Sequence, residues 1–436
     1  MDKSDYFLRL VRLQHLLERL ETDRFPAKVT QLSHGLTVIH QYLPATSVVV
    51  ADIWVRAGAS AEPHEWSGMA HFLEHMIFKG TKYLPPGMFD RLVEHSGGMT
   101  NAATSHDYAH FFLTAAAPYL ADTLPHLAEI LLHAEIPDEE FYLEREVVLE
   151  EIRASYDDPD WLGFQALCGS MYQCHPYGRP ILGDEAQLMK HTPNQMRCFH
   201  RTYYQPENMT VSIVGGIEED RALSLIEDSF AKFRAPSECP PSIVEAEPPL
   251  ISIRRTQMYL PRLEQARLVM GWMGPGVEQI QDAFGLDLLS VILAGSRSSR
   301  LVRELQQEKQ LVFHIESTFS LQRDSSLFTI AAWLKEEHLE SVEQIIRDRL
   351  AQLQATPISE AELERAKRLL INDYIFSTET PGQLAGLYGY YQTIATAQMS
   401  AIYPMAIGQF QPLELQCLAD RYLSPECYAI TIMQPC

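Results

Sequence analysis

A proline-rich segment divides the chain near its middle. Residues 233–250, FRAPSECPPSIVEAEPPL, contain five prolines, and the hydrophobic periodicity of the flanking sequence disappears there. Proline lacks a backbone donor and disfavours the interiors of helices and sheets, so this composition is typical of an extended linker. Because 436 residues are too many for one ordinary domain, the sequence predicts two domains, residues 27–232 and 251–436, joined by this linker.

Strands and helices alternate in the first half, and the second half loosely repeats it. The stretch GMAHFLEHMIFKGT (68–81) aligns with AFGLDLLSVILAGS (283–296), about half the chain away. The chain is therefore predicted to contain two copies of one domain. In the first copy the hydrophobic patterns predict strands at 36–43, 47–56, 99–105, 108–115 and 209–214, and helices at 68–79, 117–133 and 138–156, with one more between Pro86 and Gly97.

The net charge of −22 argues against nucleic-acid binding, because an acidic surface repels phosphate backbones. The seven cysteines are scattered and include no CxxC pair, which predicts reduced thiols and a cytoplasmic location. No stretch of 18 apolar residues is present, so no membrane span is predicted.

Residues 1–26 are predicted to form an amphipathic helix ahead of the first domain. Arginines alternate there with apolar residues at helical spacing, which are Phe7, Leu10, Leu13, Leu17 and Leu20. We expect this helix to pack on the body of the protein or on a partner, with peripheral association at a membrane surface as the alternative.

The sequence His71-Phe72-Leu73-Glu74-His75 lies within the first predicted helix of the first domain. Residues four apart share one face of a helix, so both imidazoles can reach a single ion. Glu74, three residues after His71, also points toward that face. Two neutral imidazoles suit zinc, and a nearby carboxylate can take a proton from a water molecule that the zinc activates.

A catalytic zinc site needs a third protein ligand and an open position for water. Beyond its first turn, the predicted helix at 138–156 offers the carboxylates of Glu144, Glu146, Glu150 and Glu151. Glu144 and Glu151 are seven residues apart, which places them on one face two turns apart. Glu146 and Glu150 are interpreted as part of a solvated face.

The motifs HFLEHMIFKGT, GGMTNAATSHDYAHF and LEREVVLEEI together resemble the pitrilysin or insulinase family of zinc peptidases with an inverted motif. The resemblance spans roughly residues 27–430 and is strongest to half-length members such as the mitochondrial processing peptidase and its bacterial relatives. It implies an α+β fold with two homologous domains, each an antiparallel sheet with helices packed on one face. The second domain would lack the metal motif.

The resemblance also implies roles for individual residues. His71, His75 and Glu151 match the ligands of one zinc ion per chain, and Glu74 matches the general base. Glu144 matches a supporting acid behind the ligands. The resemblance assigns substrate pairing to the edge of a strand, at Gly98, Asn101, Ala102 and Thr104.

Two positions in the second domain depart from the family pattern. Active members carry an arginine and, seven residues later, a tyrosine that reach the substrate and the developing oxyanion. Gln306 and Phe313 stand at the matching positions of ELQQEKQLVFH. We therefore expect the chain to be the metal-bearing subunit of a heterodimer whose homologous partner supplies the arginine and tyrosine, or else a homodimer. Drift at a dispensable position is the other interpretation.

The predicted function is a zinc metalloendopeptidase that cleaves unfolded peptides or presequence-like segments. A non-catalytic subunit that keeps the fold for a structural or peptide-holding role is the alternative, although such subunits usually have eroded metal motifs. A purely structural zinc is disfavoured, because structural sites have four protein ligands and the sequence offers no fourth.

Overall fold

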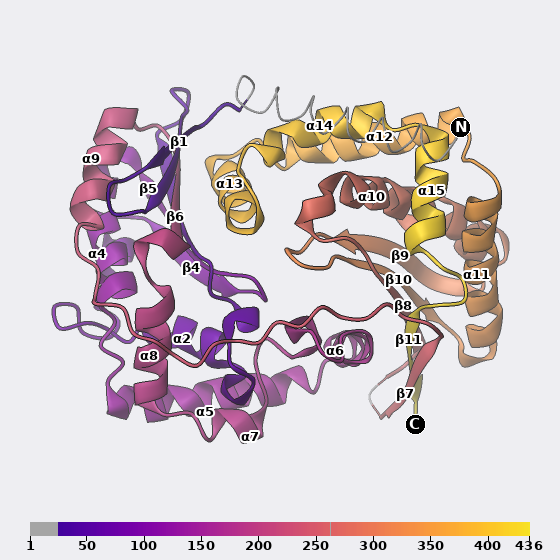
Figure 1. Ribbon diagram of the computed structural model, residues 1–436, viewed down its shortest axis with the longest axis horizontal. Coiled ribbons are helices and arrows are strands. Elements are labelled where there is room, and N and C mark those ends of the chain that lie inside the picture. Colours follow the sequence, from indigo (N-terminus) through magenta and orange to yellow (C-terminus); the bar gives the residue numbers. More distant parts are fainter. Residues whose placement is uncertain (1–24, 262) are drawn as a thin grey trace.

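The computed structural model describes residues 25–261 and 263–436, and it consists of two halves that each contain one sheet and several helices (Figure 1). The predicted two-domain α+β architecture is confirmed. The amphipathic helix expected at 1–26 falls almost entirely outside the described residues. None of the described helices is long and apolar enough to cross a membrane.

The first sheet has the strand order β1-β2-β6-β3-β5-β4, which places β4 at one edge. Its strands are β1 Lys28–Gln31, β2 Thr37–Tyr42, β3 Val48–Val55, β4 Met99–Thr104, β5 Ala109–Ala116 and β6 Met209–Gly215. The helices of this half are α2 Met69–Ile77, α3 Met88–His95, α4 Leu120–His133, α5 Asp138–Ser155, α6 Pro159–Met171, α7 Glu185–Leu188, α8 Pro193–Tyr203 and α9 Glu219–Ser229. The elements predicted for this half are present, with small shifts at their ends.

The second sheet has the order β7-β11-β8-β10-β9, which repeats the connectivity of the first sheet apart from β1. Its strands are β7 Arg254–Leu260, β8 Ala266–Met273, β9 Val312–Ser320, β10 Leu327–Leu334 and β11 Ala429–Pro435. The helices are α10 Ile280–Ala294, α11 Leu339–Ala355, α12 Glu360–Phe376, α13 Pro381–Ile394, α14 Met399–Gln409 and α15 Pro412–Tyr422, with a π-helix at Val302–Glu308. In each half a helix follows the central strand and packs beside the edge strand, α2 against β4 and α10 against β9.

Both sheets are mixed, which differs from the purely antiparallel sheets that we expected. β6 runs parallel to β2, and β11 runs parallel to β7, while the other pairs are antiparallel. A parallel neighbour requires a long crossover connection. In each half the last strand returns only after several helices, and this long connection permits the parallel pairing.

Each half also contributes one helix to the other half's sheet. α13, from the second half, packs against β3 and β6, where Ala385 and Tyr388 join a buried cluster with Val50 and Val214. α6, from the first half, packs on the second sheet through Leu167. α13 lies between the two sheets (Figure 1). We call the face of the first sheet that carries α13 its inner face.

Residues 233–251 form neither helix nor strand and connect the two halves (Figure 1). The segment is nonetheless packed, because Ser242 Oγ donates to Ser60 O at 2.6 Å and Glu247 Oε2 accepts from Cys174 N at 2.7 Å. We propose that this segment is the boundary between the two domains along the chain, although the exchanged helices cross that boundary in space.

Candidate metal centre

Helix α2 carries both histidines of the HxxEH motif, and its start is fixed by backbone geometry. Gly68 adopts a left-handed conformation with φ of 85° just before the helix. A Cβ at Gly68 would lie 2.6 Å from Leu182 O, so only glycine fits. The carboxylate of Glu62 accepts from Gly68 N at 3.0 Å and from Ala70 N at 2.7 Å. This acid therefore satisfies amide groups that the first turn of a helix leaves free.

The two histidines of α2 converge on one carboxylate of α5. The Nε2 atoms of His71 and His75 lie 3.6 Å and 3.4 Å from Glu151 Oε2. One ligand atom from each of these residues lies within 4.8 Å of the others, and no other group of this kind was found in the described parts of the chain. Packing of Phe72 on Phe141, with ring centroids 4.6 Å apart, holds the two helices together.

Glu144 lies behind His75, on the same face of α5 as Glu151 and two turns before it. His75 Nδ1 donates to Glu144 Oε1 at 3.0 Å, and Lys79 Nζ lies 2.5 Å from Glu144 Oε2. The bond fixes the imidazole so that Nε2 faces Glu151. Burial opposes ionisation of Glu144, but hydrogen bonds from His75 and Lys79 outweigh it and lower the pKa of the carboxyl.

The pKa values of the two imidazoles shift in opposite directions. Burial lowers the pKa of His71 to about 4, so this ring is neutral at pH 7. Burial also opposes a charge on His75, but its hydrogen bonds with Glu144 and Glu151 prevail and raise its pKa to about 9. A cation is therefore favoured beside His75 and Glu151, and a divalent metal ion could take the place of the proton there.

Glu74 lies on α2 between the two histidines in sequence, and it contacts the edge strand β4. Its Oε2 accepts from Thr104 Oγ1 at 2.6 Å, and burial raises the pKa of the carboxyl. A carboxylate with a raised pKa is a stronger base near neutral pH.

Strand β4 has β5 as its one neighbour among the described strands, so its other edge is free. Asn101 Oδ1 accepts from Ala102 N at 2.9 Å, an amide that a peptide could otherwise engage. Gly98 precedes the strand, and a Cβ there would lie 3.0 Å from Thr114 O. Thr104 connects the end of the strand to Glu74. The structure thus places the predicted substrate-binding residues along one edge strand, and the Thr104 end of this strand contacts Glu74.

Gln306 and Phe313 lie together in the second half. Gln306 Nε2 donates to Phe313 O at 2.7 Å, and the Phe313 ring is half exposed. Within the described structure, neither side chain hydrogen-bonds to His71, His75 or Glu151. Two further acids of α5, Glu146 and Glu150, also lie apart from these three residues. Glu150 pairs with Arg153 at 2.6 Å on the surface, and Glu146 is exposed.

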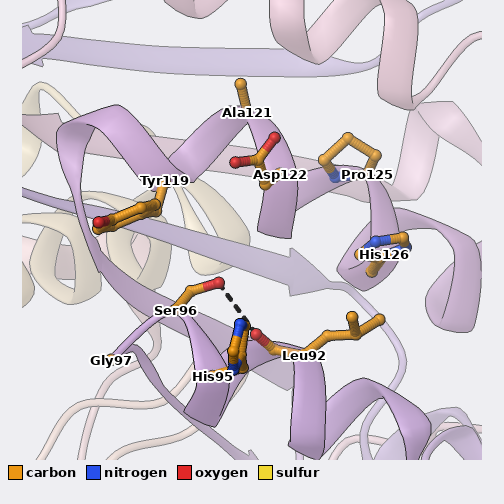
Figure 2. A pocket seen from close by; sticks show the side chains of 9 residues that line it. All are labelled: Leu92, His95, Ser96, Gly97, Tyr119, Ala121, Asp122, Pro125 and His126. Atoms are coloured by element: carbon orange, nitrogen blue, oxygen red, sulfur yellow. Dashed lines mark hydrogen bonds between the residues drawn. The ribbon is translucent and has the colours of Figure 1, made fainter.

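A pocket elsewhere in the first half does not bring its polar side chains together as the candidate metal site does. It lies between the end of α3 and the start of α4, and its lining includes His95, Asp122 and His126 (Figure 2). In Figure 2 these three side chains point in different directions, and Ser96 Oγ donates to Leu92 O at 3.0 Å. We assign no chemistry to this pocket.

Sequence reasoning missed Lys79 and Glu62. Lys79 stands four residues after His75, one turn further along, so its spacing could have indicated a contact with Glu144. Glu62 precedes the motif in a loop, and no periodic pattern there signals that its carboxylate will cap α2.

Fold and site together define a two-domain α+β protein in which three side chains converge and could hold a metal ion. Residues 37–185, which contain all three, match the insulinase family (peptidase family M16), and residues 190–370 match the peptidase M16 inactive domain. The chain belongs to this family of metallopeptidases.

Relatives in this family carry zinc-protease names. The zinc protease PqqE of Helicobacter pylori is 28% identical over 93% of this chain and 92% of that protein. The crystal structure of a protease from Helicobacter pylori covers 94% of this chain and 99% of that one, with a TM-score of 0.87 and 26% identity. The periplasmic protease PqqL of Escherichia coli shares the fold, with a TM-score of 0.77 at 20% identity, and this chain covers 47% of it.

Proposed function

We propose that the protein is a zinc metalloendopeptidase that hydrolyses unfolded peptides or presequence-like segments. The observation that carries the proposal is the approach of both imidazole Nε2 atoms of α2 to one oxygen of Glu151, with Glu74 on the same helix. Family membership and the names of the relatives support a metallopeptidase.

The donor set fits zinc. His71, His75 and Glu151 would hold one ion per chain, and two imidazoles with one carboxylate are typical of catalytic zinc, which keeps a position open for water. The orientation of His75 by Glu144 is the type of support that zinc-binding histidines usually have. Zinc bound there would polarise the scissile carbonyl and lower the pKa of a water molecule.

The residues of the chain would divide the remaining work. Glu74 takes the proton of the attacking water and later gives it to the leaving amine, since its carboxylate lies next to the ligands. Thr104 holds Glu74 in place through its hydroxyl. The free edge of β4 pairs with the backbone of an extended peptide, which gives affinity with little dependence on sequence.

The partner assignment remains part of this proposal. Gln306 carries no charge and Phe313 no hydroxyl, so neither could stabilise an oxyanion as an arginine and a tyrosine would. We propose that a homologous subunit supplies those groups, or that a second copy of the chain completes the enzyme less efficiently. The cytoplasmic location stays a prediction.

A non-catalytic, peptide-holding subunit is the second candidate function. The match of residues 190–370 to a domain described as inactive is compatible with it. This match begins after the histidine motif and lies mostly in the second half, whereas the candidate ligands, the candidate base and the acid behind them all precede it in the first half. The geometry therefore favours a peptidase.

The test is cleavage of an unstructured peptide library by the purified, zinc-loaded chain, read by mass spectrometry, with Glu74→Gln as the matched variant. We expect Glu74→Gln to bind zinc as the wild type does and to lose roughly 10²- to 10⁴-fold in kcat. Full activity in Glu74→Gln would exclude this residue as the base. Zinc bound without cleavage by the wild type, even with a homologous subunit added, would favour the peptide-holding function.

A further inference from the structure

The inner face of the first sheet carries a group of rings beside the metal centre that the proposed mechanism does not use. Trp54 of β3 and His110 of β5 are stacked, with ring centroids 4.3 Å apart and planes inclined by 24°. Tyr108 lies against the same tryptophan at 4.6 Å. Trp54 is buried, whereas 19% of the His110 side chain is exposed. His110 is therefore the member of the stack that a ligand could reach.

A buried carboxylate fixes the orientation of this imidazole. Asp52 Oδ1 lies 3.0 Å from His110 Nδ1, and the aspartate side chain is only 4% exposed. A ring that is hydrogen-bonded on one nitrogen and stacked on one face has little freedom to rotate. The part of the ring that remains accessible is thus preorganised.

Strand register connects the ring stack to the free edge of the sheet. Trp54 lies opposite His110, and His110 lies opposite Ala103 of β4. Directly opposed residues on one face have Cβ atoms about 4.5–5.5 Å apart. Ala103 is exposed and offers only a methyl group, so it leaves open the space above the strand next to His110. A peptide strand added to β4 would place one residue in this row.

This row is adjacent to the metal centre. Ala103 precedes Thr104, which hydrogen-bonds Glu74. Successive side chains of a strand point to opposite faces. Ala102 packs on the core on the helix side, so Ala103 projects to the inner face. A substrate residue in the row of Ala103 would likewise project away from the helices.

We propose that Ala103, His110 and Trp54 form a subsite that receives one aromatic side chain of the peptide substrate, stacked on the accessible part of His110. Asp52 is a positioning residue that holds the imidazole. This inference rests on the proposed peptidase function, because it assumes that a peptide pairs with β4.

The shape and charge of the subsite favour an aromatic group. A flat ring above the Ala103 methyl group would extend the stack that His110 already forms with Trp54 and, at a longer centroid distance of 6.1 Å, with Phe112. An acidic side chain would approach the buried Asp52 carboxylate, and a small aliphatic one would leave most of the imidazole uncovered. Arginine is the competing planar group, and the experiment separates the two.

The experiment measures binding, which does not require turnover. Polar seven-residue peptides, each with phenylalanine at one position, are titrated against the zinc-loaded Glu74→Gln chain and followed by fluorescence anisotropy. We expect one position at which phenylalanine binds about 2- to 10-fold more tightly than alanine or arginine, the range for one aromatic pair. The flanking positions should show no dependence on His110.

Variants assign the preference to the subsite. His110→Ala should reduce the phenylalanine-to-alanine ratio to about one, and Asp52→Asn should reduce it in part, because the ring is retained without its anionic partner. Ala103→Leu keeps every ring but fills the space above the strand, so it should also abolish the preference. His34→Ala is the matched control, since His34 contacts Phe233 at 5.4 Å in the turn between β1 and β2 at the opposite edge of the sheet.

Equal binding at every position, a preference for arginine, or a phenylalanine preference that survives in both His110→Ala and Ala103→Leu would overturn the subsite. Cleavage of the same peptides by the wild type distinguishes failure of the proposed subsite from failure of the proposed peptidase function. Cleavage without any aromatic preference overturns the subsite alone. A preference in binding without cleavage by the wild type, with or without a homologous subunit, supports the subsite and contradicts the peptidase. No binding of any peptide would overturn both.

Discussion

Replacement of Glu144 tests whether the two acids of α5 have the different roles that their geometry indicates. One oxygen of Glu151 lies near the Nε2 atoms of both histidines, whereas Glu144 contacts the other ring nitrogen of His75, Nδ1, at 3.0 Å. Glu144 should therefore tune zinc affinity, and Glu151 should largely determine it. The variants to compare are Glu144→Gln, Glu144→Ala and Glu151→Gln.

The expected magnitude follows from the contacts that each variant loses. Glu144→Gln keeps an oxygen that can accept from His75 Nδ1 but loses the negative charge, and its amide would face the Lys79 ammonium. Groups that orient a metal-binding histidine are typically worth about 10- to 100-fold in metal affinity, or roughly 1.4–2.7 kcal/mol. We expect Glu144→Gln near the lower end of this range and Glu144→Ala near the upper end. Glu151→Gln should weaken zinc binding more than either, because it removes a ligand.

The assay is competition for zinc between each variant and a chelating indicator of known affinity at fixed pH, with folding checked by circular dichroism. Glu146→Gln is the matched control, because Glu146 lies on the same helix with its side chain 62% exposed, and it should bind zinc as the wild type does. The reasoning would be refuted if Glu144→Gln lost more affinity than Glu151→Gln, since the ligand role would then pass to Glu144. Wild-type affinity in Glu144→Ala would show that the hydrogen bond to His75 does not support the site.

The remaining predictions concern the second half, the exchanged helix and the metal. Gln306→Arg combined with Phe313→Tyr should raise peptide cleavage by the isolated chain; an unchanged rate in kinetic assays would contradict the role assigned to these positions. Gly389→Ala should lower Tm, because a Cβ there would lie 2.0 Å from Trp54 Nε1 and overpacking costs about 1–3 kcal/mol. Gly408→Ala is the control and should not lower Tm, because a Cβ at Gly408 would have no atom within 4 Å. Equal Tm values for the two variants would contradict the close packing of α13. A chelator should stop cleavage and lower Tm, and added zinc should restore both; a Tm that does not respond would argue against metal bound in the folded state.

Sequence patterns predicted those features that depend on local periodicity. The HxxEH spacing placed both imidazoles on one face of α2, and the seven-residue spacing of Glu144 and Glu151 placed both acids on one face of α5. Periodicity could not decide which acid approaches the Nε2 atoms, since this depends on how α2 and α5 cross. That distinction came from the family resemblance, and the structure supplies its geometric basis in the contacts of each acid.

Features that depend on long-range packing were not predicted. The exchange of α6 and α13 between the halves leaves no trace in hydrophobic periodicity, because each is simply a helix with an apolar face. The pairing of Asp52 with His110 arises from the register of β3 and β5, which lie far apart in the chain. The parallel pairs were missed for the same reason, because alternation of apolar residues indicates a strand but not the direction of its neighbour.

The two halves show how the copy of this domain that carries the HxxEH motif differs from the copy that lacks it. α2 and α10 occupy corresponding places, each beside the edge strand of its sheet. In the first half the contact joins Thr104 Oγ1 to the Glu74 carboxylate. In the second half Ser317 Oγ of β9 donates instead to the main-chain oxygen of Ser290 on α10, at 2.6 Å. A main-chain acceptor is present whatever side chain the helix carries at that position, so this contact holds α10 on β9 without an acidic residue. The helix α10 can therefore bury leucines where α2 directs a carboxylate toward the candidate metal site.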